Sequence, residues 1–173
     1  MSQPTLTYIP HEDFLAAIRT LAAQVEKSGW RPSFIIGVGR GGLVPSTFLS
    51  HATGWPMLSV DYSAQVPGFS DEPLARLSQM AANGERLLFV DDINDTGRTI
   101  RHLRELLAVA SPPEDGIRFA VMIDNIRSME KVDYQSQIID RAVTKDWFVF
   151  PWEAISSHST ILTDAAAVPE RTA

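Results

Sequence analysis

The sequence predicts one α/β domain in which helices flank a parallel central sheet. Two observations lead to this fold class: short apolar runs alternate with amphipathic segments, and the 173 residues contain no internal repeat or low-complexity linker. A short, continuous apolar run is typical of a strand that is buried on both faces of a parallel sheet. Runs of this kind lie at residues 34–38, 87–90 and 117–123.

Helices and strands alternate along the amino-terminal half. Residues 11–28 are predicted to form an amphipathic helix, because apolar residues recur at helical spacing before Gly29. The strand at 34–38 is followed by Gly39-Arg40-Gly41-Gly42 and then by a predicted helix at 43–53. The next segments are a strand at 56–62, a loop at 63–71, and either a helix or an irregular hairpin at 73–83.

The most informative stretch is LLFVDDINDTGRTI, residues 87–100. Asp91 and Asp92 follow the apolar run where the strand is expected to end, and Asp95 comes just before Thr96-Gly97-Arg98-Thr99. Apolar residues then recur at helical spacing from Ile100 onward. Ligands bind at the carboxyl ends of the strands in open α/β sheets, so we expect a binding site here.

The residue types of this stretch indicate a ligand. The backbone amides of residues 96–99 would point out of the start of a helix, where unpaired donors and the helix dipole favour a phosphate. Three carboxylates beside a phosphate would repel it, so they fit a role in holding sugar hydroxyls or a hydrated Mg²⁺. Phosphate, diol and metal together suggest a phosphorylated ribose.

Composition excludes several classes of protein. The 45% hydrophobic and 21% charged residues are ordinary for a globular domain. No apolar run approaches the roughly 20 residues that span a bilayer, and the amino terminus lacks the features of a signal peptide. The chain has no cysteine for disulfides or thiolate zinc sites, and its net charge of −6 argues against nucleic-acid binding. We therefore expect a cytoplasmic protein with neither a membrane nor a nucleic acid as partner.

Glycines after the first predicted sheet strand offer a different function. Gly37, Gly39 and Gly42 satisfy G-x-G-x-x-G between a strand and a helix. Asp61 follows about 20 residues later, as a dinucleotide-binding fingerprint requires. On this pattern alone, the chain would be an oxidoreductase with a nicotinamide or flavin cofactor.

The stretch 87–100 resembles the phosphoribosyl diphosphate (PRPP) signature of the type I phosphoribosyltransferases. That signature is an apolar strand, two acidic residues, a short spacer, an acidic residue and then T-G-x-T. The resemblance implies that Asp91 and Asp92 orient ribose hydroxyls and metal waters and that Asp95 accepts a proton from the purine nitrogen. It also implies that the 5′-phosphate is bound by Thr96, Gly97, Arg98 and Thr99.

A second match lies at Gly39, Arg40, Gly41 and Gly42, which are similar to the S-R-G-G loop of the family's purine enzymes. The resemblance implies that this loop binds the pyrophosphate of PRPP. It further implies a cis peptide bond, not involving proline, that enters Arg40. Two motifs in the family's order favour a transferase over the oxidoreductase.

A third match covers residues 145–153, which are similar to the base-binding segment of the xanthine-guanine phosphoribosyltransferases. It implies that Trp147 stacks on the purine, that backbone groups near Phe148 and Val149 read the edge of the base, and that Glu153 reaches the metal. Val149 stands where these relatives often have an acidic residue.

Another departure lies at the end of the strand at 117–123. In the xanthine-guanine enzymes, a lysine at this point reads the purine 6-oxygen. Asn125 (or Asp124) stands there in this chain, so the identity of the base stays open.

Together the resemblances imply a purine phosphoribosyltransferase of nucleotide salvage. It would transfer phosphoribosyl from PRPP to a 6-oxopurine (hypoxanthine, guanine or xanthine) and release pyrophosphate, with Mg²⁺ held by Asp91, Asp92 and Glu153. Relatives are usually dimers or tetramers, so we expect a homodimer or homotetramer. The alternatives are a regulatory protein that binds PRPP or a nucleotide without catalysis and, less favoured, the dinucleotide-dependent oxidoreductase.

The expected layout is one domain over residues 1–173. Its core spans about residues 30–155, and a small hood combines about 60–80 with 140–155. Residues 160–173 are predicted to be a flexible tail.

Overall fold

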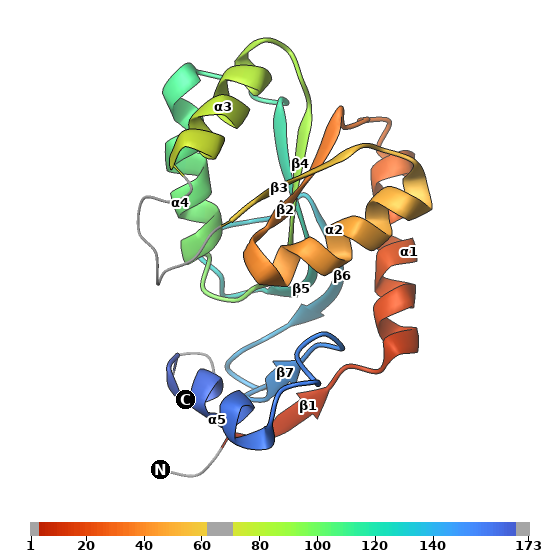
Figure 1. The fold of residues 1–173 in the computed structure, drawn as a ribbon, viewed down its shortest axis with the longest axis vertical. Coiled ribbons are helices and arrows are strands. Elements are labelled where there is room, and N and C mark those ends of the chain that lie inside the picture. Colours follow the sequence, from red (N-terminus) through yellow and green to blue (C-terminus); the bar gives the residue numbers. More distant parts are fainter. Residues whose placement is uncertain (1–3, 62–70, 169–173) are drawn as a thin grey trace.

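The fold is a doubly wound α/β domain, described here from a computed structural model for residues 4–61 and 71–168. Within these residues, the main sheet has five parallel strands in the order β3-β2-β4-β5-β6 (Figure 1). The strands are β2 (Phe34–Val38), β3 (Met57–Val60), β4 (Leu87–Asn94), β5 (Ile117–Asn125) and β6 (Tyr134–Ile139). The predicted α/β class with a parallel central sheet is confirmed.

Helices cover both faces of this sheet (Figure 1). One face carries α1 (His11–Lys27) and α2 (Gly39–Thr53), and the other carries α3 (Asp71–Ala82) and α4 (Arg98–Leu107). A short 3₁₀ helix, η1 (Ala108–Ala110), follows α4. None of the helices in the described part of the chain is long and apolar enough to cross a membrane.

Alternate residues of the central strand serve two hydrophobic cores. Leu88 and Val90 of β4 pack in the core beneath α1, and Leu87 and Phe89 pack in the core beneath α3 and α4. Successive strand residues point to opposite faces, so a strand between two helix layers must be apolar at every position. This is why continuous apolar runs predicted the strands.

The strand order creates a crevice between β2 and β4. β3 lies on one side of β2 and β4 lies on the other, so the connections that leave β2 and β3 run to opposite sides. Ligands in doubly wound sheets bind at the carboxyl ends of the strands at such a switch point. The first turn of α2 and the acidic end of β4 meet there.

Two boundaries differ from the prediction. β4 continues to Asn94, because Asp91, Ile93 and Asn94 pair with residues of β5. Asp91 and Asp92 therefore belong to the strand and do not follow it. α2 begins at Gly39 and not at residue 43, so the glycine-rich segment forms the first turn of the helix.

The cis peptide bond implied before Arg40 is not found. No cis peptide occurs in residues 4–61 or 71–168. Instead, Gly39 has a φ of +52°, and this left-handed conformation turns the chain from β2 into α2. A Cβ on Gly42 would collide with the carbonyl oxygen of Val90, so the close contact between α2 and β4 requires glycine.

The hood is built differently from the prediction. β7 (Trp147–Val149) pairs in parallel with β1 (Leu6–Tyr8), and both lie beside α5 (His158–Ala166) (Figure 1). Residues 71–80, which the sequence places in the hood, instead belong to α3, whose Leu74 and Leu77 are buried in the core. The predicted loop at 63–71 lies outside the described residues, apart from the start of α3.

The prediction of a flexible tail at residues 160–173 is wrong for residues 160–166, which belong to α5. α5 begins after Ser157, whose hydroxyl accepts a hydrogen bond from the backbone N–H of Thr160 at 3.2 Å. Ile161 and Ala165 are buried, and this burial holds the helix in place. Residues 169–173 lie outside the described part of the chain.

Candidate active site

The acidic pair of β4 lies against the first turn of α2. A Cβ on Gly41 would come within 3.0 Å of a carboxylate oxygen of Asp91 and closer still to one of Asp92. The backbone N–H of Asp92 donates to Oδ1 of Asp91 at 3.0 Å. The structure therefore brings the acidic pair together with the glycine-rich segment.

The loop between β4 and α4 packs against the β5–β6 loop, residues 126–133. Gly97 has a φ of +87°, and a Cβ there would lie 2.7–2.8 Å from atoms of Met129, Ser128 and Glu130. The backbone N–H of Met129 donates to the carbonyl of Thr96 at 3.2 Å. The glycine of the T-G-x-T motif is thus required both by backbone conformation and by close packing.

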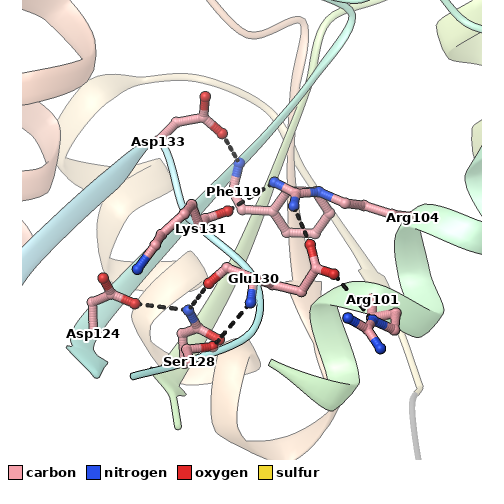
Figure 2. A network of polar contacts seen from close by, with 9 residues as sticks. Arg101, Arg104, Phe119, Asp124, Ser128, Glu130, Lys131 and Asp133 are labelled. Atoms are coloured by element: carbon pink, nitrogen blue, oxygen red, sulfur yellow. Dashed lines mark hydrogen bonds and ion pairs between the residues drawn. The ribbon is translucent and has the colours of Figure 1, made fainter. Parts of the chain in front are cut away.

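Buried polar side chains tie the β5–β6 loop to β4 (Figure 2). Nδ2 of Asn94 donates to Asp124 at 2.7 Å and to the carbonyl of Glu130 at 2.8 Å. Its Oδ1 accepts from the hydroxyl of Ser128 at 2.8 Å. Burial raises the pKa of Asp124, and this effect exceeds the opposing influence of the Asn94 hydrogen bond and of nearby Lys131.

The carboxylate of Glu130 joins the same loop to α4 (Figure 2). It forms ion pairs with Arg101, at 3.2 Å, and with Arg104. Burial alone would raise the pKa of Glu130, but hydrogen bonds from the two arginines outweigh it and leave this pKa lowered. Helix α4, which begins at the expected phosphate-binding residues 96–99, is therefore fixed to the β5–β6 loop by these ion pairs.

Asp95 is held in a buried ion pair. Its carboxylate accepts from Nε of Arg141 at 3.0 Å and from Nη2 at 2.8 Å, and the two side chains are 3% and 9% exposed. Nη1 of Arg141 donates to the carbonyls of Thr144, at 3.3 Å, and Asp146, at 2.6 Å. The predicted proton acceptor therefore faces a fixed guanidinium.

Asn125 braces the backbone around this pair. Nδ2 of Asn125 donates to the carbonyl of Asp95 at 2.9 Å, and Oδ1 accepts from the backbone N–H groups of Arg127 and Arg141 at 3.2 Å each. The side chain is buried and directed to main-chain groups. Its role in reading the base stays a prediction, and the contacts that the structure shows for its amide are all to main-chain groups.

Residues 147–149 of the hood direct their main-chain groups to different sides of β7. Trp147 and Val149 face β1: the N–H of Trp147 donates to Thr5, and the carbonyl of Val149 accepts from Ile9, at 2.8 and 2.9 Å. Adjacent residues of a strand direct their main-chain groups to opposite edges, so those of Phe148 point away from β1. Val149 is also buried, and its carbonyl is already bonded to Ile9 of the chain beside β1, so its role in reading the base stays a prediction.

Two adjoining pockets lie between the sheet edge and the hood. The inner pocket is lined by Asp92, Ile93, Asp95, Arg141, Trp147, Phe148, Phe150 and Glu153. The outer pocket shares three of these residues and adds others, including Arg40 and Gly41 from α2. The shared residues are Asp92, Trp147 and Glu153. Predicted residues from all three sequence motifs thus line these two pockets.

Comparison with known proteins decides the family. Residues 6–155 match the model of the phosphoribosyl transferase domain. The chain belongs to this family. The recognition of a phosphoribosyltransferase from the motifs is therefore confirmed.

The relatives and solved structures agree with this assignment. The chain is 30% identical over 139 residues to the xanthine-guanine phosphoribosyltransferase of Gluconobacter oxydans, covering 78% of this chain and 77% of the relative. It is 30% identical over 125 residues to that of Idiomarina loihiensis, covering 69% and 70%. The crystal structure of a purine phosphoribosyltransferase from Pyrococcus horikoshii superposes with a TM-score of 0.66 at 26% identity, covering 88% of this chain and 96% of that one.

The oxidoreductase alternative has no support in this transferase. Gly37 packs in the core, where an added Cβ would lie 3.1 Å from the Ser46 hydroxyl. Gly42 makes room for the contact between α2 and β4. These glycines are explained by the packing of helix against strand, which a phosphoribosyltransferase needs as much as a dinucleotide-binding protein does.

The residues expected to hold Mg²⁺ have suitable chemistry. The described residues contain no group of three His, Cys, Asp or Glu side chains that could hold a metal by itself. Mg²⁺ usually binds through one or two carboxylates together with waters and substrate phosphates. Asp92 and Glu153 line both pockets and so fit that mode, with Asp91 next to them.

Sequence reasoning missed two contributors to the transferase site. Arg141 comes two residues after the end of β6, and the carboxyl ends of parallel strands share one edge, so a charged residue at this position is the kind of signal that could have found it. The β5–β6 loop gave no such signal. Its contact with Gly97 arises only when α4 and β5 are brought together.

Proposed function

We propose that this protein transfers a phosphoribosyl group from PRPP to a 6-oxopurine and releases pyrophosphate, as an enzyme of purine salvage. The observation that carries the proposal is the convergence of Asp92, Asp95, Trp147 and Glu153 on one pocket beside the first turn of α2. Two relatives at 30% identity are named xanthine-guanine phosphoribosyltransferases, which supports a purine as the acceptor.

PRPP would lie along the carboxyl edge of β2 and β4. The backbone amides of residues 96–99 would bind its 5′-phosphate at the start of α4. Asp91 and Asp92 would accept hydrogen bonds from the ribose hydroxyls. Gly39–Gly42 and the Arg40 side chain would bind the pyrophosphate, and bound Mg²⁺, held by Asp91, Asp92 and Glu153, would neutralise its charge.

The base would occupy the inner pocket. Trp147 would stack on its face, a contact worth about 1–3 kcal/mol per base. The main-chain groups of Phe148 would meet its edge. As the ring nitrogen bonds to the ribose carbon and the bond to pyrophosphate breaks, positive charge develops on the sugar and the base. Asp95 would accept the proton that the base then loses.

Pyrophosphate release tests this proposal. The protein is incubated with PRPP, Mg²⁺ and, in separate reactions, hypoxanthine, guanine, xanthine, adenine or uracil. We expect release with at least one 6-oxopurine and none when the base is omitted. Release with uracil alone, or with none of the bases, would overturn the proposal.

One observation favours a second candidate, the regulatory protein that binds PRPP or a nucleotide without catalysis. Both carboxylate oxygens of Asp95 already accept hydrogen bonds from Arg141. Saturable PRPP binding, measured by calorimetry, together with no pyrophosphate release would establish this alternative.

The cellular setting belongs to the same proposal. We expect the enzyme to act in the cytoplasm and to form a homodimer or homotetramer. Light scattering coupled to size-exclusion chromatography measures the assembly, and a monomeric mass at micromolar concentration would contradict the expectation.

A further inference from the structure

We propose that Arg141 is the residue that selects the purine, by donating a hydrogen bond to the C6 oxygen of the base. Asp95 would accept from the adjacent ring N–H. This inference rests on the proposed function, since it names the residue that reads the base in the same pocket.

Arg141 has one guanidinium N–H beyond those that its four hydrogen bonds use. Nε and one Nη2 hydrogen go to Asp95, and Nη1 goes to the carbonyls of Thr144 and Asp146. A guanidinium has one more N–H than these four bonds use. Within residues 4–61 and 71–168, this second Nη2–H has no acceptor among the hydrogen bonds of Arg141.

The side chain that carries this donor lines the proposed base site. Arg141 and Asp95 both line the inner pocket together with Trp147. The guanidinium carbon of Arg141 lies 5.3 Å from the centre of the Phe148 ring, in cation–π contact. Asn125 fixes the backbone on both sides, through the carbonyl of Asp95 and the N–H of Arg141. The pair is therefore set before any base arrives.

The pair presents a definite hydrogen-bonding pattern. Oδ2 of Asp95 and Nη2 of Arg141 are 2.8 Å apart, so an acceptor stands beside a donor. A carboxylate oxygen can accept more than one hydrogen bond. A 6-oxopurine carries the complementary pair, because the N–H at N7 is adjacent to the oxygen on C6. Arginine also reads the C6 oxygen of guanine in nucleic-acid grooves.

Adenine carries the opposite group at C6. Its amino N–H groups would face the Nη2–H, so two donors would meet in a buried site and one would stay unpaired. A site built to hydrogen-bond a substrate group rejects an analogue that lacks it far more strongly than an apolar pocket does. The pocket is therefore specific for the oxo group over the amino group.

The proposed reaction balances with this arrangement. N9 attacks the ribose C1′ with its lone pair, the C1′–O bond breaks, and pyrophosphate leaves with the electron pair. The N7 proton passes to Asp95 and then to solvent. Arg141 keeps its own protons throughout and holds the C6 oxygen.

Binding of two inert bases tests the inference. 9-Deazahypoxanthine keeps the N7–H and the C6 oxygen, 9-deazaadenine carries the amino group, and neither has the attacking nitrogen. Affinities are measured by calorimetry with PRPP and Mg²⁺ present, for wild type, Arg141→Lys, Arg141→Gln and Arg127→Gln. Arg127 is the matched control, because it pairs with an aspartate, Asp140, outside both pockets.

We expect wild type and Arg127→Gln to prefer 9-deazahypoxanthine. The Arg141 variants should reduce this preference by about 10- to 100-fold. Equal wild-type affinities for the two analogues would overturn the inference even if no Arg141 variant folds. An unchanged preference in a folded Arg141→Lys protein would overturn it as well.

The outcome is separable from the fate of the proposed function. Pyrophosphate release with hypoxanthine, combined with an unchanged preference in Arg141→Lys, would leave the enzyme and remove Arg141 from base selection. If no base causes pyrophosphate release but the preference for 9-deazahypoxanthine depends on Arg141, the base site is supported and the proposed catalysis is overturned.

Discussion

At the scale of single residues, one substitution at Asp95 tests both its proposed role as proton acceptor and its buried ion pair with Arg141. We expect Asp95→Asn to lower turnover by about 10²–10⁴, because the proton acceptor is lost. Stability should also fall, by about 3–5 kcal/mol, because the Arg141 charge stays buried without its partner. Steady-state kinetics and urea unfolding measure the two effects. An unchanged kcat in the folded variant would remove Asp95 from the mechanism.

Gly97 is required by its contacts as well as by its backbone conformation. Gly97→Ala should raise KM for PRPP and destabilise the fold by more than the about 1–2 kcal/mol of a left-handed alanine. The extra cost arises because the new methyl group would push against Ser128, Met129 and Glu130. Gly84→Ala is the control, since φ there is +96° but a Cβ would meet no atom within 4 Å. Equal losses of stability in the two variants would show that the contacts do not matter.

Asp124 should make stability depend on pH. Burial raises its pKa in the folded protein above the unfolded value, so the native state holds the proton more tightly. Stability from this group is therefore greatest at low pH and is lost as the pH rises through the folded pKa. We expect Asp124→Asn, which keeps an acceptor for Asn94, to gain stability relative to wild type as the pH rises from about 4 toward neutrality.

Unfolding by urea at several pH values checks this prediction. Asp140→Asn is the control with the opposite sign, because the hydrogen bond from Arg127 lowers the pKa of Asp140. Its stabilising contribution is lost as the pH falls. Parallel pH profiles for wild type and Asp124→Asn would contradict the assignment.

At the scale of elements, the β5–β6 loop should control PRPP binding from outside the pocket. Glu130→Gln removes the charge that clamps this loop to Arg101 and Arg104 of α4. We expect KM for PRPP to rise several-fold while KM for the base stays the same. The reason is that only residues 96–99, the proposed 5′-phosphate site at the start of α4, would be held less firmly. Stability should change by no more than about 1 kcal/mol, since the side chains of Arg101 and Arg104 are 52% and 42% exposed.

Asp115→Asn is the matched control for the loop. Asp115 forms an exposed ion pair with Arg86, and neither residue lines the inner or outer pocket. This variant should leave both KM values unchanged. Equal KM values for PRPP in wild type and Glu130→Gln would show that the clamp has no part in binding.

At the scale of the whole molecule, the first strand supports β7, the strand that carries two residues of the proposed base site. β1 pairs with β7 along its whole length, and Thr7 donates a hydrogen bond to the carboxylate of Asp146 at 2.6 Å. Deleting residues 1–8 should raise KM for the base more than KM for PRPP, because β7 carries Trp147 and Phe148. Circular dichroism should still report the folded main sheet. A base KM that matches wild type would show that the hood stands without β1.

The sequence by itself determined the fold class, three buried strands and the motifs that indicate the family. Buried strands need apolar residues on both faces, so residues 34–38, 87–90 and 117–123 were legible as strands. A phosphate loop needs glycine and hydroxyls, and the expected ribose and metal contacts need carboxylates, so Asp91 to Thr99 carried a contiguous signal. The α/β class and the family followed from these local patterns.

Only the tertiary structure decided the partners of those residues. Arg141 reaches Asp95 across 46 positions of sequence, and β1 reaches β7 from the opposite end of the chain. Asn125 was expected to read the base, but its amide satisfies three main-chain groups. Buried polar groups are hydrogen-bonded in folded proteins, and their partners often lie on elements that are distant in the sequence. The spacing of residues along the chain therefore does not predict these contacts.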